Sequence, residues 1–166
     1  MALEIERKFL VRDESYKALA TSHSRIVQGY ICSERGRTVR VRLRSTADGE
    51  GKGYLTIKGP SLNGGLSRYE FEKEISVDEA LSLLKICEKG VIDKVRWLVP
   101  LSDGHVIEVD EFHAENQGLT IAEIELNYED EPYERLDFLG KEVTGDRRYY
   151  NSNLRLNPYA NWAQKS

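Results

Sequence analysis

Apolar and polar residues alternate along several segments of this chain, and charged residues occupy most of the polar positions. Within residues 3–11, Glu4, Glu6 and Lys8 hold alternate positions. Residues 38–45 carry arginine at every second position, and residues 67–75 carry glutamate in the same way. Because residues two apart in a strand point to the same side of a sheet, this spacing predicts strands that each have a row of charge on one face.

The same analysis of the whole chain predicts a mainly β protein with a few helices. Strands are expected at residues 3–11, 25–32, 38–45, 54–58, 67–75, 91–100, 105–112 and 119–128. Helices are expected at residues 14–20, 133–139 and 146–156. A further helix is expected to begin at a capping box formed by Ser76 and Glu79. Short turns join most of the strands, which favours antiparallel pairing.

These elements predict an α+β fold in which roughly eight antiparallel strands form a barrel with flanking helices. The apolar residues of the strands, among them Val41 and Ile124, would face outward beneath the helices. The charged rows would then face the lumen, which inverts the usual barrel pattern. No internal repeat or linker divides the chain, so residues 1–166 are expected to form one domain.

The composition narrows the kinds of partner. A net charge of −4 argues against general nucleic-acid binding, which leaves a basic footprint. No apolar run approaches the roughly 20 residues that span a bilayer, so no membrane partner is expected. The N-terminus lacks a signal-peptide pattern, and Cys32 and Cys87 lack the spacing of a disulfide framework or a zinc site. These features favour the cytoplasm.

Rows of carboxylates are candidate metal ligands. Glu4 and Glu6 form the first row, and Mg²⁺ or Mn²⁺ binds carboxylate oxygens together with substrate phosphate oxygens. A charged edge strand protected against aggregation is the structural alternative. Some acids would bind metal and others would only balance lysine and arginine. The further rows are Glu70-x-Glu72, Glu108-x-Asp110 and Glu123-x-Glu125.

Rows of cations are candidate phosphate ligands. Arg40 and Arg42, with Arg44 continuing the row, offer planar guanidinium groups that match pairs of phosphate oxygens. Cross-strand salt bridges on a solvated face are the structural alternative. Three arginines in one row repel one another, and a ligand with several negative charges would neutralise them. The cationic set also includes Lys58, Lys94 and Arg96.

Other polar and aromatic residues are expected to have structural or surface roles. The three histidines lack the spacing of metal ligands, and Glu74 and Glu111 are expected to be ordinary surface charges. Packing of the terminal helices is the expected role of Tyr149, Tyr150, Tyr159 and Trp162.

Taken in chain order, these motifs resemble the CYTH superfamily, the triphosphate tunnel metalloenzymes. Glu4-Ile5-Glu6-Arg7-Lys8 is similar to the N-terminal E-x-E-x-K signature of that family, and the similarity continues along nearly the whole chain. The further motifs are Gln28-Gly29-Tyr30, Val39-Arg40-Val41-Arg42, Thr56-Ile57-Lys58-Gly59, Glu70-Phe71-Glu72, Lys94-Val95-Arg96, Glu108-Val109-Asp110, Ala122-Glu123-Ile124-Glu125-Leu126, Glu142-Val143-Thr144 and Tyr150-Asn151.

The resemblance implies an eight-stranded tunnel whose charged lumen binds a linear triphosphate with Mg²⁺ or Mn²⁺. It implies catalytic roles for Glu4, Glu6 and Lys8. The substrate-binding residues that it implies are Lys8, Arg40, Arg42, Lys58, Lys94 and Arg96. The metal-binding acids that it implies are Glu4, Glu6, Glu123 and Glu125, with Glu70, Glu72 and Asp110 as further candidates. Arg44 and Glu108 fall outside the core motif.

The small size and the opening motif are most similar to the inorganic triphosphatases of this family. The expected function is metal-dependent hydrolysis of inorganic tripolyphosphate to pyrophosphate and phosphate. An adenylate cyclase, a nucleoside or thiamine triphosphatase and a non-catalytic polyphosphate-binding module stay open as alternatives. The expected partners are a small triphosphate-containing molecule and, as a second copy of this chain, a homodimer partner.

Overall fold

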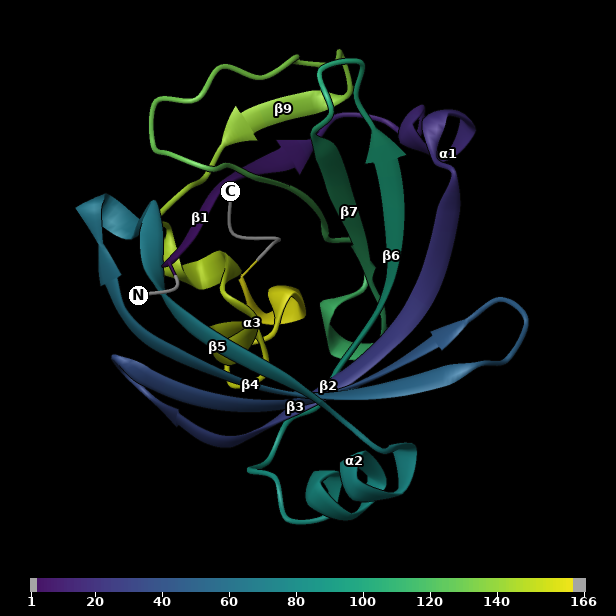
Figure 1. Ribbon diagram of the computed structural model, residues 1–166, viewed down its shortest axis with the longest axis vertical. Coiled ribbons are helices and arrows are strands. Elements are labelled where there is room, and N and C mark those ends of the chain that lie inside the picture. The colour runs from purple at the N-terminus through teal and green to yellow at the C-terminus, as the bar shows by residue number, and fades with distance from the viewer. Residues whose placement is uncertain (1–2, 163–166) are drawn as a thin grey trace.

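Eight antiparallel strands close into a barrel in the computed structural model, which describes residues 3–162 (Figure 1). The strand order is β5-β4-β3-β2-β6-β7-β8-β1, and the barrel closes where β1 pairs with β5. This arrangement confirms the predicted eight-stranded antiparallel barrel. The barrel strands are β1 (Leu3–Val11), β2 (Ser22–Glu34), β3 (Arg37–Thr46), β4 (Gly51–Leu62), β5 (Ser67–Ile75), β6 (Ile92–Pro100), β7 (Val106–Phe112) and β8 (Thr120–Glu125).

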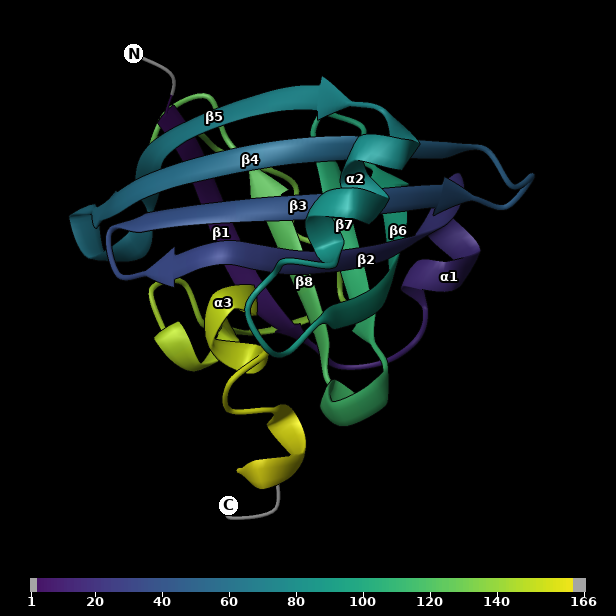
Figure 2. The same ribbon diagram turned by 90° about the horizontal axis from the view of Figure 1, so that it is seen from below.

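Two groups of strands cross around the lumen. β2 to β5 lie side by side, and β6, β7, β8 and β1 run across them at a steep angle (Figure 2). Arg42 of β3 pairs with Gln28 of β2 and with Tyr54 of β4. Because paired residues share one face of a sheet, the arginine row of β3 faces the lumen together with these two polar side chains.

The apolar residues of the strands form cores on the outer surface of the barrel, as predicted. Phe9 and Ile124 are fully buried in one cluster with Phe138, which comes from the segment after β8. The helix α2 (Val77–Leu84) lies over β3 and β4. Gly53 of β4 permits its close approach, since a Cβ atom there would lie 2.8 Å from Ala80 Cβ. The inverted pattern therefore depends on elements packed outside the barrel.

The helices are short, and one begins at the predicted capping box. Glu79 N donates to Ser76 Oγ at 3.0 Å, and Ser76 N donates to Glu79 Oε1 at 2.8 Å. No helix within residues 3–162 is long and apolar enough to cross a membrane. The remaining helical elements are α1 (Tyr16–Leu19), α3 (Asn151–Leu154) and the 3₁₀ turns η1 (Asn63–Gly65), η2 (Ala114–Asn116), η3 (Arg147–Tyr149) and η4 (Tyr159–Asn161).

Two of the predicted helices are wrong. Residues 133–139 are irregular and lead into a ninth strand, β9 (Leu139–Glu142), in which Leu139 pairs with Val11 of β1. The apolar residues there do not form a helical face, because Phe138 is buried against the barrel. Tertiary packing thus overrides helix propensity in this segment. The predicted helix at 146–156 is η3 followed by α3, because Tyr150 between them has an extended backbone with φ −71° and ψ 135°.

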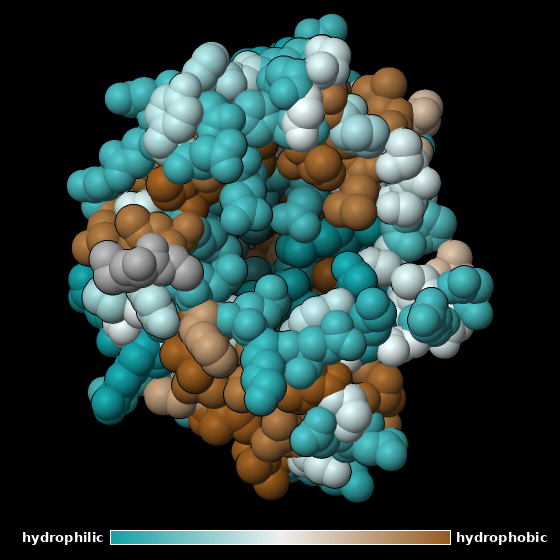
Figure 3. Space-filling model, viewed as in Figure 1, coloured by the Kyte–Doolittle hydropathy of each residue, from teal (hydrophilic) through white to brown (hydrophobic). Residues whose placement is uncertain are grey.

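The two ends of the lumen differ. Tyr150, Asn151 and Ser152, at the start of α3, line the cavity inside the barrel, and α3 lies behind the lumen in Figure 1. The opposite end opens toward the viewer as a hollow lined by hydrophilic residues (Figure 3). A ligand can therefore enter from this side, and residues at the start of α3 line the cavity at the other end.

Candidate active site

A cavity of about 300 Å³ occupies the lumen, and every barrel strand contributes at least one side chain to its wall. The predicted site residues that line it are Glu4, Glu6, Lys8, Arg40, Arg42, Lys58, Glu70, Glu72, Arg96, Glu123 and Glu125. Lys94 and Asp110 are not among the lining residues. The structure thus brings most of the predicted set together from six different strands.

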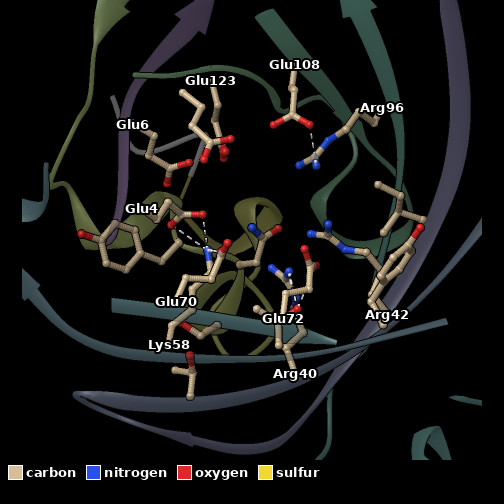
Figure 4. A pocket seen from close by; sticks show the side chains of 18 of the residues that line it. Glu4, Glu6, Arg40, Arg42, Lys58, Glu70, Glu72, Arg96, Glu108 and Glu123 are labelled. Carbon is tan, nitrogen blue, oxygen red and sulfur yellow. Dashed lines mark hydrogen bonds and ion pairs between the residues drawn. The ribbon is translucent and has the colours of Figure 1, made fainter. Parts of the chain in front are cut away.

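One side of the cavity is acidic. In Figure 4, Glu4, Glu6 and Glu123 lie together, across the open space from Arg42 and Arg96. Burial raises the pKa of Glu6 well above its ordinary value, and the carboxylates of Glu123 and Glu4 raise it further. Burial also opposes ionisation of Glu123, but Lys8 and Arg96 outweigh it and hold the Glu123 pKa well below the ordinary range. Crowded carboxylates of this kind favour a cation between them.

Glu4 is held by two cations at this wall. Lys58 Nζ lies 2.9 Å from Glu4 Oε1 and 3.0 Å from Oε2, and Arg68 Nε lies 3.4 Å from Oε1. Burial opposes ionisation of Glu4, yet Lys58 and Arg68 keep its pKa well below the ordinary value. Burial and the neighbouring Glu4 raise the pKa of Glu70 to about 7. Lys58 and Arg68 thus compete with a metal for the oxygens of Glu4.

The arginines of β3 form the cationic side, and each of them hydrogen-bonds a neutral side chain. Arg40 Nη2 donates to Thr56 Oγ1 at 3.2 Å, and Arg42 Nε donates to Gln28 Oε1 at 3.0 Å. Arg44 Nη2 donates to Tyr54 Oη at 3.4 Å.

Their positive charge is not balanced locally. No carboxylate within residues 3–162 forms an ion pair with Arg40, Arg42 or Arg44. Burial, Arg40 and Arg96 together lower the pKa of Arg42 to about 9. Within the same described part of the chain, Arg40 Nε and Gln28 Nε2 are buried nitrogens without a hydrogen-bond partner. This surface is suited to an anion with several charges.

The cations of β6 differ because carboxylates of β7 neutralise them. Lys94 Nζ lies 2.7 Å from Asp110 Oδ2, and Arg96 Nε and Nη2 donate to Asp110 at 2.7 and 2.9 Å. Arg96 Nη1 also donates to Glu108 Oε2 at 3.1 Å. Arg96 and Lys94 overcome the effect of burial and lower the pKa of Asp110 to about 2. Asp110 is therefore saturated by cations behind the cavity wall.

Several residues that line the cavity were not in the predicted set. Arg68 precedes Glu70 and Glu72 at the same alternate spacing, so the strand pattern contained a signal for it. Arg44 and Glu108, which belong to the charged rows but not to the core motif, also line the cavity. The others include Tyr30, Tyr54, Thr56, Tyr150 and Asn151. For the neutral residues among them, the strand pattern marks the inward face but gives no sign of chemistry.

The prediction that Tyr150 is a packing residue is wrong. Its ring lies 4.9 Å from Lys8 Nζ and 5.4 Å from the Arg68 guanidinium, in the geometry of cation–π contacts. The remaining aromatic residues of the C-terminal segment, Tyr149, Tyr159 and Trp162, do pack on one another as predicted. Tyr150 leaves this cluster because its extended backbone turns it toward the lumen.

Comparison with known proteins agrees with this geometry. The family model of the CYTH domain matches residues 2–152. The chain belongs to the CYTH family. An inorganic triphosphatase of Acetivibrio thermocellus is 48% identical over 165 residues, 99% of this chain and 100% of that protein. An inorganic triphosphatase of Nitrosomonas europaea is 34% identical over 92% of this chain and 97% of its own length. A crystal structure of an inorganic triphosphatase has a TM-score of 0.62 at 28% identity, covering 94% of this chain and 96% of the other.

The acidic wall of this CYTH domain fits a divalent metal that is shared with a substrate. Within residues 3–162, no three acidic, histidine or cysteine side chains converge into a complete metal-binding group. Mg²⁺ normally keeps several waters and takes only one or two carboxylates plus substrate phosphate oxygens. Glu6 and Glu123 supply such carboxylates, and the pKa of Glu6 is raised first by burial and then by the charge of Glu123. The donor set is therefore suited to Mg²⁺ or Mn²⁺ bound together with a phosphate chain.

Proposed function

We propose that this protein hydrolyses inorganic tripolyphosphate to pyrophosphate and phosphate with Mg²⁺ or Mn²⁺. The observation that carries the proposal is the unbalanced arginine row of β3, which faces crowded carboxylates across one cavity. A free triphosphate would supply the missing negative charge, and its phosphate oxygens would complete the coordination of a metal. The two relatives that bear the name inorganic triphosphatase support the choice of substrate.

The proposed roles follow the two walls. Arg40 and Arg42 would bind the phosphate chain, together with Lys8, Lys58 and Arg96. The acidic wall would hold the metal, with Glu4, Glu6 and Glu123 nearest to one another and Glu70, Glu72 and Glu125 as further ligands. When bound, a divalent ion would neutralise phosphate charge and lower the pKa of a coordinated water.

Positioning and charge neutralisation would account for most of the catalysis. Water would attack the terminal phosphorus in line with the bridging oxygen, which leaves with pyrophosphate. The cations along the chain would hold that geometry and stabilise the charge on the leaving group. Lys94 and Asp110 would act indirectly, because Asp110 pairs with Lys94 and accepts two hydrogen bonds that fix the guanidinium of Arg96 at the wall.

A phosphate-release assay tests the proposal against its alternatives. Tripolyphosphate, ATP and thiamine triphosphate are compared with Mg²⁺ and with Mn²⁺, and excess chelator is added at the end. We expect release of phosphate from tripolyphosphate that stops with the chelator. Preferred hydrolysis or cyclisation of ATP would instead favour a nucleotide enzyme. Tight tripolyphosphate binding without turnover would favour a binding module.

Glu6→Gln provides the matching variant. It is expected to lower kcat by a factor of about 10² to 10³ while the barrel stays folded, because the amide cannot replace a metal-binding carboxylate. Glu74→Gln is the control, since Glu74 is exposed on β5 and does not line the cavity. Wild-type activity that survives the chelator would contradict metal dependence.

We also propose that the protein is cytoplasmic and forms a homodimer without nucleic-acid or membrane partners. Cys32 and Cys87 are free thiols, which supports a reducing compartment. Leu3, Tyr69 and Phe71 are at least one-third exposed on neighbouring positions of β1 and β5, and they offer an apolar surface to a second copy. Light scattering on the purified protein measures its mass directly, and a monomer at micromolar concentration would contradict the dimer.

A further inference from the structure

The middle of β1 lacks a neighbouring strand on one side. Leu3 to Ile5 pair with β5, and Phe9 and Val11 pair with β9. Between these pairings, the edge of β1 that faces away from β8 has no strand partner in the described part of the chain. Glu6 and Lys8 lie in this interval, and both carry their side chains into the cavity. β8 holds the other side of this stretch, so on the open side the backbone that presents two proposed catalytic residues is fixed by something other than a neighbouring strand.

Two loops supply the missing hydrogen bonds. Glu6 N donates to the Leu66 carbonyl oxygen at 3.0 Å, and Val143 N donates to the Lys8 carbonyl oxygen at 2.8 Å. Lys8 N donates to a side chain, Thr144 Oγ1, at 3.0 Å. Of these three hydrogen bonds, only the one to Thr144 can be removed by changing a side chain. A substitution of Thr144 therefore tests the function of this seam between β1 and the two loops.

The hydroxyl of Thr144 is oriented as an acceptor for Lys8. Its single proton goes to Glu142 Oε2 at 2.7 Å, which leaves its lone pairs for the amide of Lys8. Glu142 Oε2 in turn lies 3.0 Å from Arg7 Nη1. The chain Arg7, Glu142, Thr144 thus begins on the outer face of β1 and ends at the backbone of Lys8.

The two loops can approach β1 together because glycines meet between them. Gly65 and Gly145 both have positive φ, at 91° and 82°. A Cβ atom at Gly65 would lie 2.6 Å from Gly145 Cα, and a Cβ atom at Gly145 would overlap the carbonyl oxygen of Gly64. Side chains at these positions would separate the loops and withdraw Thr144 from Lys8.

A second, small cavity lies at this seam. Its volume is about 10 Å³, which is close to the space of one water molecule. Glu4, Glu6 and Lys8 line it from β1, and Thr144 and Gly145 line it from the loop. The loop contact is therefore adjacent to the acidic wall.

We propose that Thr144 is a positioning residue, which fixes Lys8 and the neighbouring Glu6 in their catalytic orientation through the backbone of β1. This inference rests on the proposed triphosphatase function. A displacement of about 1 Å at such groups costs as much as a hundredfold in rate. The remaining cations of the lumen would still bind the triphosphate, so the effect should fall on kcat more than on KM.

Thr144→Val tests the inference, because valine keeps the shape of threonine and removes the hydroxyl. We expect kcat for tripolyphosphate to fall about ten- to a hundredfold, with a smaller change in KM. Thr144→Ser keeps the hydroxyl and should restore most of kcat. Thr46→Val is the matched control, since its exposed hydroxyl lies in the β3–β4 hairpin and outside the cavity. It should leave both constants unchanged.

Hydrogen exchange of the Lys8 amide, followed by NMR without substrate, gives a second measurement that does not depend on turnover. In Thr144→Val this amide should exchange faster while amides of β3 and β4 keep their protection. Loss of protection throughout the barrel, or a kcat within twofold of wild type with Lys8 still protected, would overturn the inference. An inactive wild type would contradict the proposed function instead, and the exchange result would still test the contact.

Discussion

The two cationic strands β3 and β6, which lie on either side of β2 in the barrel, carry similar spacing but differ in what neutralises them. On β3, Arg40 and Arg42 hydrogen-bond Thr56 and Gln28, which carry no charge. On β6, Lys94 and Arg96 share the carboxylate of Asp110. The positive charge of β6 is balanced by a carboxylate of the protein, whereas the positive charge of β3 has only neutral hydrogen-bond partners.

This difference predicts which cations have a structural role and which bind a ligand. A buried cation next to a carboxylate has its desolvation cost offset by the protein, so removing either partner leaves an uncompensated charge. A cation with neutral partners is destabilised by its like-charged neighbours, and ligand binding relieves that repulsion. The comparison predicts that substitutions on the two strands will have opposite consequences for stability and for activity.

Asp110→Asn is expected to have the largest effect on stability. It removes the carboxylate that neutralises Lys94 and Arg96, and the loss of one partner from a buried ion pair costs about 3–5 kcal/mol. The free energy of unfolding, measured with a chemical denaturant at constant pH, checks this expectation.

Asp93→Asn, on the neighbouring strand β6, is the control. Asp93 pairs with Arg25, whose side chain is 63% exposed, and exposed ion pairs contribute about 0–1 kcal/mol. Equal losses of stability in Asp110→Asn and Asp93→Asn would remove the distinction between buried and exposed carboxylates on which the comparison depends.

Arg42→Met is expected to spare stability and impair substrate binding. Methionine keeps much of the apolar stem, and loss of a charged hydrogen bond to phosphate costs about 1.5–3 kcal/mol, which lowers kcat/KM about ten- to a hundredfold. The unfolding free energy should stay within about 1 kcal/mol of wild type or rise, because Arg40 and Arg96 no longer repel this position. Steady-state kinetics and denaturation measure the two quantities.

Arg25→Met is the matched control, since it removes an arginine from the outer surface. It should leave kcat/KM unchanged. A destabilised Arg42→Met variant with normal activity would show that the β3 row has a structural role like that of β6.

The alternation of charge was sufficient to predict the barrel because sheet geometry alone determines which face each residue occupies. Val41 and Arg42 lie on opposite faces in the structure, as their positions require. The helix prediction failed at residues 133–139, where the apolar residues have helical spacing but Phe138 is buried against the barrel. Only contacts made across the fold decide such a segment.

Most of the predicted site residues line one cavity, but the sequence could not assign their partners. Arg42 and Arg96 occupy equivalent positions in their patterns, yet Arg42 binds an amide and Arg96 binds a carboxylate. Asp110 was predicted as a metal ligand because it continues a carboxylate row, and that role stays a prediction. Tyr150 enters the lumen through a backbone turn for which the sequence offers no periodic signal.

Lys58 of β4 shares features with the cations of both strands, because a carboxylate neutralises it and that carboxylate is open to a ligand. This arrangement predicts coupling between the binding of metal and the binding of substrate. Its partner Glu4 lines the cavity, so a triphosphate can take over Lys58 and release Glu4 for a metal. We expect Mn²⁺ to raise the affinity for a non-hydrolysable tripolyphosphate analogue about 5- to 150-fold, the usual range of such coupling. Calorimetric titration with and without Mn²⁺ measures the factor.

Lys58→Met supplies the comparison for this coupling. The variant removes in advance the nearer of the two cations that hold Glu4, so the enhancement by Mn²⁺ should be smaller than in the wild type. The solution chemistry of Mn²⁺ with the analogue is the same in both titrations. An equal enhancement in the two proteins would contradict exchange of Glu4 between Lys58 and the metal.

The smallest expected effect lies outside the tunnel, at His105, where carboxylates balance a group that titrates near neutral pH. Nε2 lies 2.6 Å from Glu131 Oε2, and Nδ1 lies 2.9 Å from Asp103 Oδ1 without hydrogen-bond geometry. Asp103 and Glu131 raise the pKa of His105 above its ordinary value of about 6.5. A pKa that is raised in the folded state stabilises the protein, and this contribution is fully present at pH values below the ordinary pKa. It disappears as the pH rises through the folded-state pKa.

The wild type should therefore exceed His105→Gln in unfolding free energy by more at pH 6 than at pH 8. Denaturation of both proteins at the two pH values measures that difference, and a gap that widens toward pH 8 would reverse the expected sign.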